Sequence, residues 1–207
     1  MIPHERINQA ADCLRNGGVV VIPTDTVYGI AAHPHHPQAL ARICTIKGRP
    51  TGKPIALLAA SLDAVHAFGA TVSPAAACLA RAFWPGALTL VLPCGAGYEG
   101  FRIPDHAQTR ELLTLCGGVL RVTSANLSGA MPATTAVDAL KDVGLEADLV
   151  LDDGISPGGV ASTVVKIEPS NALTVIREGA LSATLLHRAL EQSCNHDQPL
   201  QKSSAIQ

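Results

Sequence analysis

Residues 19–29 have the sequence VVVIPTDTVYG, and this stretch decides the fold class. The run of β-branched residues from Val19 to Ile22 predicts a short strand that is buried on both faces. A helix is expected before it, because apolar residues recur at the spacing i, i+3, i+4 and i+7: Ile7, Ala10, Ala11 and Leu14. A pair of glycines at 17–18 ends that helix. The pattern is that of an α/β protein.

Helices and strands continue to alternate irregularly after this stretch. Further helices are expected to begin near Pro37, Ser61, Ser73, His106, Thr135 and Ser182. Further strands are expected over 53–58, 87–92, 100–103, 119–123, 149–151, 162–167 and 173–177. The last two strands form a hairpin across the sequence EPSN. This order predicts a single α/β domain over residues 1–194, with a mixed parallel and antiparallel sheet flanked by helices, and a flexible tail over 195–207.

The composition excludes several classes of protein. Of 207 residues, 47% are apolar and 15% are charged, which is a core-forming composition and not that of a disordered chain. The formal net charge of −2 argues against a uniformly basic surface for nucleic acid. No apolar run approaches the length of a membrane-spanning helix, and the N-terminal residues lack a signal-peptide pattern. The six cysteines contain no C-x-x-C pair, so we expect reduced, mostly buried thiols in a cytoplasmic protein without membrane contact.

The common catalytic signatures are missing from the sequence. It has no P-loop, no dinucleotide-binding glycine pattern, no H-E-x-x-H and no G-x-S-x-G. His33, His35 and His36 invite a metal interpretation. Because the neighbouring prolines extend the backbone and no cysteine or carboxylate stands nearby, we interpret them as loop histidines in solvent.

The loop PTDTVYG places hydroxyl groups at every second residue. In an extended segment, Thr24, Thr26 and Tyr28 point to the same side, and such a row can hold a small polar ligand. The alternative is a turn with ordinary local hydrogen bonds. Spacing alone leaves both interpretations open.

The segment KGRPTGKP gathers cations where a helix ends. Lys47, Arg49 and Lys53 lie within seven residues, between prolines and glycines that fix the backbone. A planar guanidinium and mobile ammonium groups suit polyphosphate recognition. A solvated basic loop, with Lys47 complementing the helix dipole, is the alternative.

Two further loops combine hydroxyls with glycines. Ser124 and Asn126 follow a strand in TSANLSG, and Ser162 and Thr163 open a strand in GGVASTVV. Such groups, with free backbone N–H donors, suit a nucleotide, although a polar loop without function has the same composition.

Two arginines stand at strand ends among apolar residues. Arg102 in FRIPDH and Arg177 in VIREG each need an anionic partner, which is either an acidic side chain or a ligand. Hydroxyls and cations without a nucleophile–base pair favour catalysis by positioning and charge stabilisation at a phosphate. The residues alone therefore predict a nucleotide or polyphosphate cleft.

The order of these motifs resembles the YrdC family of L-threonylcarbamoyladenylate synthases. PTDTVYGI, KGRPTGKPIALL, FWPGALTLVLP, FRIPDH, SANLSG, GGVASTVV and VIREGAL occur in the family's order, between about Val19 and Leu181. The resemblance implies a twisted mixed sheet around a basic concave cleft. It also implies an enzyme, a nucleotidyltransferase, that makes threonylcarbamoyl-AMP and pyrophosphate from ATP, L-threonine and bicarbonate or CO2. That product serves N6-threonylcarbamoyladenosine formation in tRNA.

The resemblance also implies roles for individual residues. Lys47 and Arg49 would be the catalytic cations. The threonine site would consist of Thr26, Tyr28, Arg102 and Ser162, with Thr24 close by. The ATP site would consist of Lys47, Arg49, Lys53, Ser124, Asn126 and Arg177. Mg²⁺ would accompany ATP, with unknown ligands.

The sequence departs from the longer members of the family at two points. They carry a threonine-binding histidine where this chain has Leu58, so that contact has no counterpart here, although short members lack the histidine too. They also have a C-terminal domain, and this chain resembles the short form without it. Arg121 stands before TSAN where an apolar residue is expected.

The resemblance implies two alternatives and two partners. The alternatives are an RNA-binding module with this fold and a carbamoyl-adenylate-forming relative of the hydrogenase-maturation type. The net charge and the 3% aromatic content argue against RNA binding. The partners are a downstream tRNA threonylcarbamoyl-transfer complex and, more weakly, tRNA itself.

Overall fold

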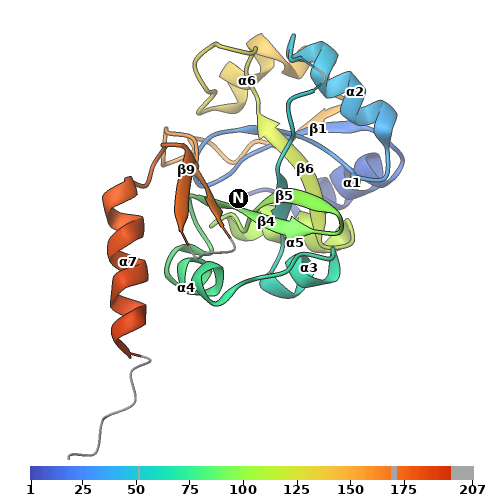
Figure 1. Ribbon diagram of the computed structural model, residues 1–207. Coiled ribbons are helices and arrows are strands. Elements are labelled where there is room, and N and C mark those ends of the chain that lie inside the picture. Colours follow the sequence, from blue (N-terminus) through green and yellow to red (C-terminus); the bar gives the residue numbers. More distant parts are fainter. Residues whose placement is uncertain (51, 169–171, 197–207) are drawn as a thin grey trace, which may run out of the picture.

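The computed structural model describes residues 1–50, 52–168 and 172–196. They form one mixed sheet with helices packed around it (Figure 1). The strands are β1 (Val19–Ile22), β2 (Gly29–Ala32), β3 (Leu57–Ala59), β4 (Leu88–Cys94), β5 (Gly97–Arg102), β6 (Val119–Ser124), β7 (Leu149–Val150), β8 (Thr163–Ile167) and β9 (Leu173–Arg177). The helices are α1 (His4–Arg15), α2 (Pro37–Ile46), α3 (Leu62–Ala67), α4 (Pro74–Phe83), α5 (Ala107–Leu115), α6 (Ala136–Asp142) and α7 (Ala183–His196), with a 3-10 turn over Gly144–Glu146.

The sheet has nine strands among the described residues, in the order β7-β1-β2-β6-β3-β5-β4-β8-β9. The pairs β1–β7, β3–β5 and β4–β8 are parallel, and the other pairs are antiparallel. The predicted mixed α/β sheet is confirmed, including the hairpin of β8 and β9. The turn of that hairpin lies outside the described residues. The predicted tail over 195–207 lies outside them from residue 197 onward.

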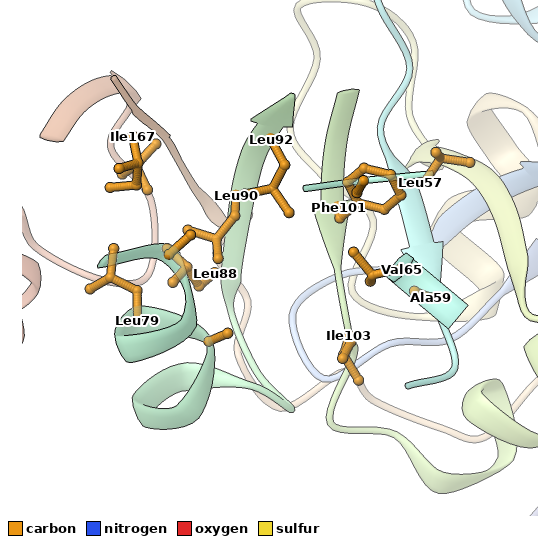
Figure 2. Packing of buried hydrophobic residues seen from close by; sticks show 14 of the residues in the cluster. Leu57, Ala59, Val65, Leu79, Leu88, Leu90, Leu92, Phe101, Ile103 and Ile167 are labelled. Carbon is orange, nitrogen blue, oxygen red and sulfur yellow. The ribbon is translucent and has the colours of Figure 1, made fainter. Parts of the chain in front are cut away.

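Both faces of β1 are buried, as its apolar sequence predicts. Val20 and Ile22 pack in a core with helices α1 and α5, and Val19 and Val21 pack in a second core with α2 and α6. A third core fills the other half of the sheet, between β3, β4, β5 and β8 and helices α3 and α4 (Figure 2). Figure 1 shows α7 on the outside of α4, at the far side from α2.

The predicted helix starts are confirmed by their caps. The hydroxyls of Ser61, Ser73, Thr135 and Ser182 accept backbone N–H groups of the first turns of α3, α4, α6 and α7. Pro37 occupies the first turn of α2. The imidazole of His106 plays the same role for α5, where its Nδ1 accepts the backbone N–H of Thr109 at 3.2 Å. Local sequence therefore sets where the helices begin.

Several strand predictions differ from the structure, and one of them is β5, which covers Gly97–Arg102 and not 100–103. Strand β3 begins at Leu57 and not at Lys53, because Pro54 has no N–H and the carbonyls of Lys53 and Pro54 instead accept the Arg49 guanidinium. Strand β2 was not predicted. Its sequence GIAA has little strand propensity, and its pairing with β1 and β6 forms it.

The cysteines also differ from expectation. Among those in the described part of the chain whose side chains are placed, no disulfide is formed. Of these, Cys116 is buried, but the others are only partly buried, so the expectation of mostly buried thiols is wrong. None of the described helices has the length and apolar character needed to cross a membrane.

Candidate functional site

The sheet brings three of the singled-out segments to one place. Ile22 of β1 pairs with Gly29 of β2, and Gly29 pairs with Ser124 of β6, so the loops that carry PTDTVYG and SANLSG leave aligned strand ends. The segment KGRPTGKP arrives at the same end, because the carbonyl of Ala56 accepts the N–H of Val122 at 2.9 Å. The loops that the sequence analysis treated separately therefore share one region.

Lys47 is buried and holds the SANLSG loop. Its side chain is 3% exposed, and its Nζ donates to the backbone carbonyls of Ser124 and Asn126. Burial and, secondarily, the charge of Arg49 lower the pKa of Lys47 to about 8, with Asp142 acting in the opposite direction. Lys47 thus has a structural task that the sequence did not reveal, and it lies beside Arg49 as predicted.

The cations form a connected series. Burial is the main cause that lowers the pKa values of Lys47, Arg177 and Arg102, and nearby charge lowers them further: Arg49 acts on Lys47 and Arg177, and Arg177 acts on Arg102. Arg49 therefore lies within electrostatic range of Lys47 and Arg177, and Arg177 within electrostatic range of Arg102. Lys53 is exposed, and no contact joins its side chain to this series in the described part of the chain. Neighbouring cations suit a polyanionic ligand, and the charge of Arg102 is itself offset by Asp25.

The side chain of Arg102 binds residues of the PTDTVYG loop. Its Nη2 lies 2.5 Å from the Asp25 carboxylate, its Nη1 donates to Thr26 Oγ1 at 2.8 Å, and its Nε donates to the carbonyl of Gly86 at 2.9 Å. Burial lowers the pKa of Arg102, and Asp25 raises it. Of the two partners that the sequence left open, the structure provides the acidic side chain.

The PTDTVYG loop is a turn and not an extended row. Thr24 Oγ1 accepts the N–H groups of Thr26 and Val27 and donates to the carbonyl of Val27 at 2.7 Å. Thr24 and Thr26 remain neighbours, with their hydroxyls 3.0 Å apart. Tyr28 leaves this row: its ring is buried, and its hydroxyl donates to the carbonyl of Gly154 at 2.7 Å. Of the two interpretations that spacing left open, the structure shows the turn with local hydrogen bonds, and the three hydroxyls do not face one side.

Burial is the main influence on the pKa of the Tyr28 hydroxyl. Desolvation raises the pKa of Tyr28 to about 12, against the opposing effect of the Asp153 N–H, which donates to the same oxygen at 3.2 Å. Tyr28 therefore stays protonated and fixes the loop that follows β7.

Ser162 and Arg177 meet at the paired ends of β8 and β9. Arg177 Nη2 donates to the Ser162 carbonyl at 2.7 Å, and Ser162 Oγ lies 2.8 Å from Thr89 Oγ1. Gly179 permits this approach, since a Cβ there would lie 2.2 Å from the carbonyl oxygen of Ala161. The structure therefore brings together a strand-end arginine and a buried serine that the sequence analysis placed in separate motifs.

Asn126 has a fixed orientation. Its Nδ2 donates to the carbonyls of Leu127 and Ala130 at 2.8 and 2.9 Å. Its Oδ1 is buried and has no hydrogen-bond partner among the described residues. A buried acceptor without a donor is unfavourable by roughly 1–3 kcal/mol, so this oxygen is suited to a ligand.

Sequence reasoning missed three residues of this region. Asp25 had a signal, because it stands inside PTDTVYG and a buried arginine needs an anion. Thr89 had none, since a threonine in the apolar strand LTLVL is ordinary. Ser156, in the loop over residues 152–160, is buried, and its hydroxyl lacks a partner in the described part of the chain.

The structure also explains residues outside the site. Arg121 forms a two-pronged ion pair with Glu99 at 2.6 and 2.7 Å and donates to the Ile55 carbonyl, which accounts for its place in a central strand. Leu58 belongs to the core. The histidines are less solvated than expected: His33 and His36 contact the carbonyls of Cys116 and Arg15 through Nε2.

Comparison with known sequences matches most of the chain. The sequence model of the Sua5/YciO/YrdC family, which carries the description Telomere recombination, covers residues 12–179. The chain is 36% identical over 171 residues to the threonylcarbamoyl-AMP synthase of Bacillus subtilis, which spans 77% of this chain and 49% of that protein. It is 35% identical over 195 residues to a putative threonylcarbamoyl-AMP synthase of Mycobacterium leprae, covering 89% of this chain and 87% of that protein.

Solved structures of proteins from the same family also match the chain. The structure of Pyrococcus abyssi Sua5 complexed with L-threonine matches with a TM-score of 0.85 at 30% identity, over 91% of this chain and 58% of that one. Escherichia coli YciO matches with a TM-score of 0.79 at 25% identity, over 89% and 94% of the two chains. The chain spans about half the length of the Bacillus and Pyrococcus curated relatives, at 49% and 51%.

Proposed function

The chain belongs to the Sua5/YciO/YrdC family, and from this premise we propose that it is an L-threonylcarbamoyladenylate synthase. The observation that carries the proposal is that cations hold the polar loops: Lys47 donates to the Ser124 and Asn126 carbonyls, Arg102 to Thr26 Oγ1, and Arg177 to the Ser162 carbonyl. Polyphosphate and an amino acid carboxylate are the anions that such a region suits. Relatives named threonylcarbamoyl-AMP synthase support the same activity.

The proposed reaction has two bond-forming steps. The threonine amine attacks CO2, derived from bicarbonate by loss of hydroxide, so that an N–C bond forms and the amine loses a proton to solvent. A carbamate oxygen then attacks the α-phosphorus of ATP, an O–P bond forms, and pyrophosphate leaves with the electrons of the broken P–O bond. No covalent enzyme intermediate is needed, in keeping with a site of hydroxyls and cations.

Cations and the SANLSG loop would serve ATP. Arg49 and Arg177 have donors available for phosphate, and their charges offset the negative charge that grows on the leaving pyrophosphate. Lys47 contributes its charge from behind the loop, because its Nζ already donates to Ser124 and Asn126. Lys53 remains a proposal that rests on its motif.

Mg²⁺ would enter with the triphosphate. No group of three or more histidine, cysteine or acidic side chains in the described part of the chain has the arrangement of a metal site, so substrate oxygens would supply most ligands. Asn126 Oδ1 has no partner among the described residues and is an acceptor of the hard type that Mg²⁺ takes, so we propose it as a protein ligand of this ion. When bound, the ion would offset charge on the leaving group.

The threonine would lie on the other side of the region. Thr26 and Ser162 offer hydroxyls, and Arg102 retains guanidinium hydrogens beyond those used by Asp25, Thr26 and Gly86. Tyr28 would act indirectly, since its hydroxyl is occupied by the loop after β7. The Pyrococcus relative was solved in complex with L-threonine, which supports a threonine site in this fold.

The product would pass to a tRNA threonylcarbamoyl-transfer complex, and we propose that the protein works in the cytoplasm. Free thiols are consistent with a reducing compartment. Direct tRNA binding stays a weaker proposal, supported by the same cations.

Pyrophosphate release from ATP and bicarbonate, with and without L-threonine, tests the function. We expect threonine-dependent release that falls by about 10²–10³ in Arg49→Ala. Arg188→Ala is the control, because Arg188 is an exposed arginine on α7. Release that does not depend on threonine would overturn the proposal. Use of carbamoyl phosphate in its place would indicate the carbamoyl-adenylate alternative, and salt-dependent tRNA binding without turnover would indicate the RNA-binding alternative.

A further inference from the structure

Ser156 differs from the other buried hydroxyl residues. Each of the others has a partner for its side-chain oxygen in the described structure: Thr24, Thr26, Thr89, Thr109, Ser162 and Thr163. Ser156 is 4% exposed, and its Oγ has no partner among the described residues. Because a hydroxyl removed from water without a new hydrogen bond is unfavourable, this oxygen retains an unused capacity to form one.

The surrounding loop has an inverted burial pattern. Ser156 is the buried residue of the stretch from 152 to 160, whereas the apolar side chains of Ile155 and Val160 are 76% and 50% exposed. A loop shaped by folding alone would turn isoleucine or valine inward and the serine outward. Here the hydroxyl faces the protein at the expense of apolar burial, which points to a functional reason for its position.

Backbone hydrogen bonds place this loop between the two halves of the site. The Ser156 N–H donates to the carbonyl of Thr134 at 2.8 Å, in the segment that follows SANLSG. The Gly158 N–H donates to the carbonyl of Asp25 at 2.9 Å, in the turn that Arg102 holds. Ser156 therefore lies at the junction of the proposed ATP and threonine sides.

Two of the three proposed substrates already have candidate ligands. Arg49 and Arg177 suit the ATP phosphates, and Arg102, Thr26 and Ser162 suit threonine. Bicarbonate, the third substrate, has none. Its carbon must lie between the threonine amine and the α-phosphorus, which is the junction where Ser156 lies.

We propose that Ser156 Oγ donates a hydrogen bond to one oxygen of the bicarbonate-derived carboxylate. The bond would hold the carbamate so that its other oxygen faces the α-phosphorus. The inference rests on the proposed function and adds a binding residue for the third substrate. Ser156 would bind this group and would take no part in proton transfer.

The test varies each substrate in turn, in buffers freed of CO2, for the wild-type chain and for Ser156→Ala and Ser156→Thr. We expect Ser156→Ala to raise the KM for bicarbonate roughly tenfold, as for one lost hydrogen bond to a charged group, with the KM values for ATP and threonine within about twofold of wild type. Ser156→Thr, which retains the hydroxyl, is expected to restore most of the affinity.

The results that would contradict this role of Ser156 can be told apart from a failure of the proposed function. An unchanged bicarbonate KM, or a rise confined to ATP or threonine, would overturn the assignment. A melting temperature of Ser156→Ala several degrees below wild type would also overturn it, because the hydroxyl would then have a partner within the protein. Failure of the proposed function itself would be seen separately, as a lack of threonine-dependent pyrophosphate release in the wild-type chain.

Discussion

Lys47 donates a hydrogen bond from its buried ammonium group to the backbone carbonyl of Asn126, so a cation of KGRPTGKP fixes the loop that carries the candidate nucleotide-binding amide. The same Nζ reaches the carbonyl of Ser124 at 2.5 Å. One side chain thereby links two motifs that are 79 residues apart in sequence. The positions of Arg49 and Asn126 are consequently interdependent.

Removing the ammonium group tests this link. Lys47→Met keeps the apolar stem but leaves the Ser124 and Asn126 carbonyls without these bonds. We expect the free energy of unfolding to fall by about 2 kcal/mol and pyrophosphate release to fall by about 10²–10³. Urea unfolding and the release assay measure the two effects. Full activity together with wild-type stability would show that the link is dispensable.

The lowered pKa of Lys47 predicts a pH dependence. Because its pKa is about 8 instead of 10.5, Lys47 loses its charge in the folded protein as the pH rises through 8. We expect kcat/KM for ATP to decrease above that pH. Lys47→Arg, which stays charged, should remove the decrease if it retains activity. A flat profile of the wild-type chain up to about pH 9.5, well above the folded pKa, would contradict the assignment.

Stability should change in the opposite direction over the same range. Between pH 8 and 10.5 the unfolded chain holds the Lys47 proton more firmly than the folded chain does, so this group makes stability rise with pH. Below pH 8 both states are protonated and the unfavourable effect of burying the charge is constant. Activity loss above pH 8 would therefore not reflect unfolding caused by Lys47.

The Glu99–Arg121 pair predicts a stability effect outside the site. Both prongs of the guanidinium bind the carboxylate, and the two side chains are only 28% and 18% exposed. Glu99→Ala leaves the arginine charge unpaired within the sheet. Since the pair is partly solvated, we expect a loss of about 2 kcal/mol, below the ~3–5 kcal/mol of fully buried pairs. Urea unfolding measures it.

A surface pair is the matched control. Asp12 and Arg15 of α1 lie 2.5 Å apart with side chains 66% and 50% exposed. Asp12→Ala should lower stability by less than about 1 kcal/mol. Equal effects at Glu99 and Asp12 would show that burial of the Arg121 pair has no energetic consequence.

The fold could be predicted where local chemistry decides it. Ser61 and Ser73 cap the helices that they were expected to start, and the four apolar residues of β1 form the expected strand. Strand β2 could not be predicted, because Gly29 is part of a strand only through its pairing with neighbouring strands. These strands approach so closely that a Cβ at Gly29 would lie 2.6 Å from Val122 Cγ1. Such a close approach is a property of the assembled sheet.

The candidate site could be predicted as a set of motifs but not as a geometry. Arg102 needed an anion, yet the sequence did not show that Asp25 supplies it. Tyr28 shared the period of Thr24 and Thr26, but the turn at Thr24 breaks that period and sends its hydroxyl to Gly154. Ser156 carried no motif, and only its burial without a partner among the described residues distinguishes it. A long-range ion pair decides the first case, a local turn the second, and the lack of a partner in the described structure the third.

Gly179 should be indispensable for the Arg177–Ser162 contact. In Gly179→Ala the new Cβ would meet the backbone of Ala161 and Ser162 at 2.2 and 2.7 Å, and backbone cannot move aside as a flexible side chain can. The strand ends must separate, so Arg177 loses the Ser162 carbonyl. We expect an unfolding free energy lower by about 1–3 kcal/mol and strongly reduced pyrophosphate release.

Gly97→Ala distinguishes this steric effect from the general loss of a glycine. Gly97 lies in β5 at the turn from β4, and a Cβ there has no heavy atom of the described structure within 4 Å. Alanine at that position should be neutral or slightly stabilising, because it restricts the unfolded chain without a clash. If Gly179→Ala is as stable and active as Gly97→Ala, the close approach of β9 to β8 does not position Arg177, and the cation series must be held by other contacts.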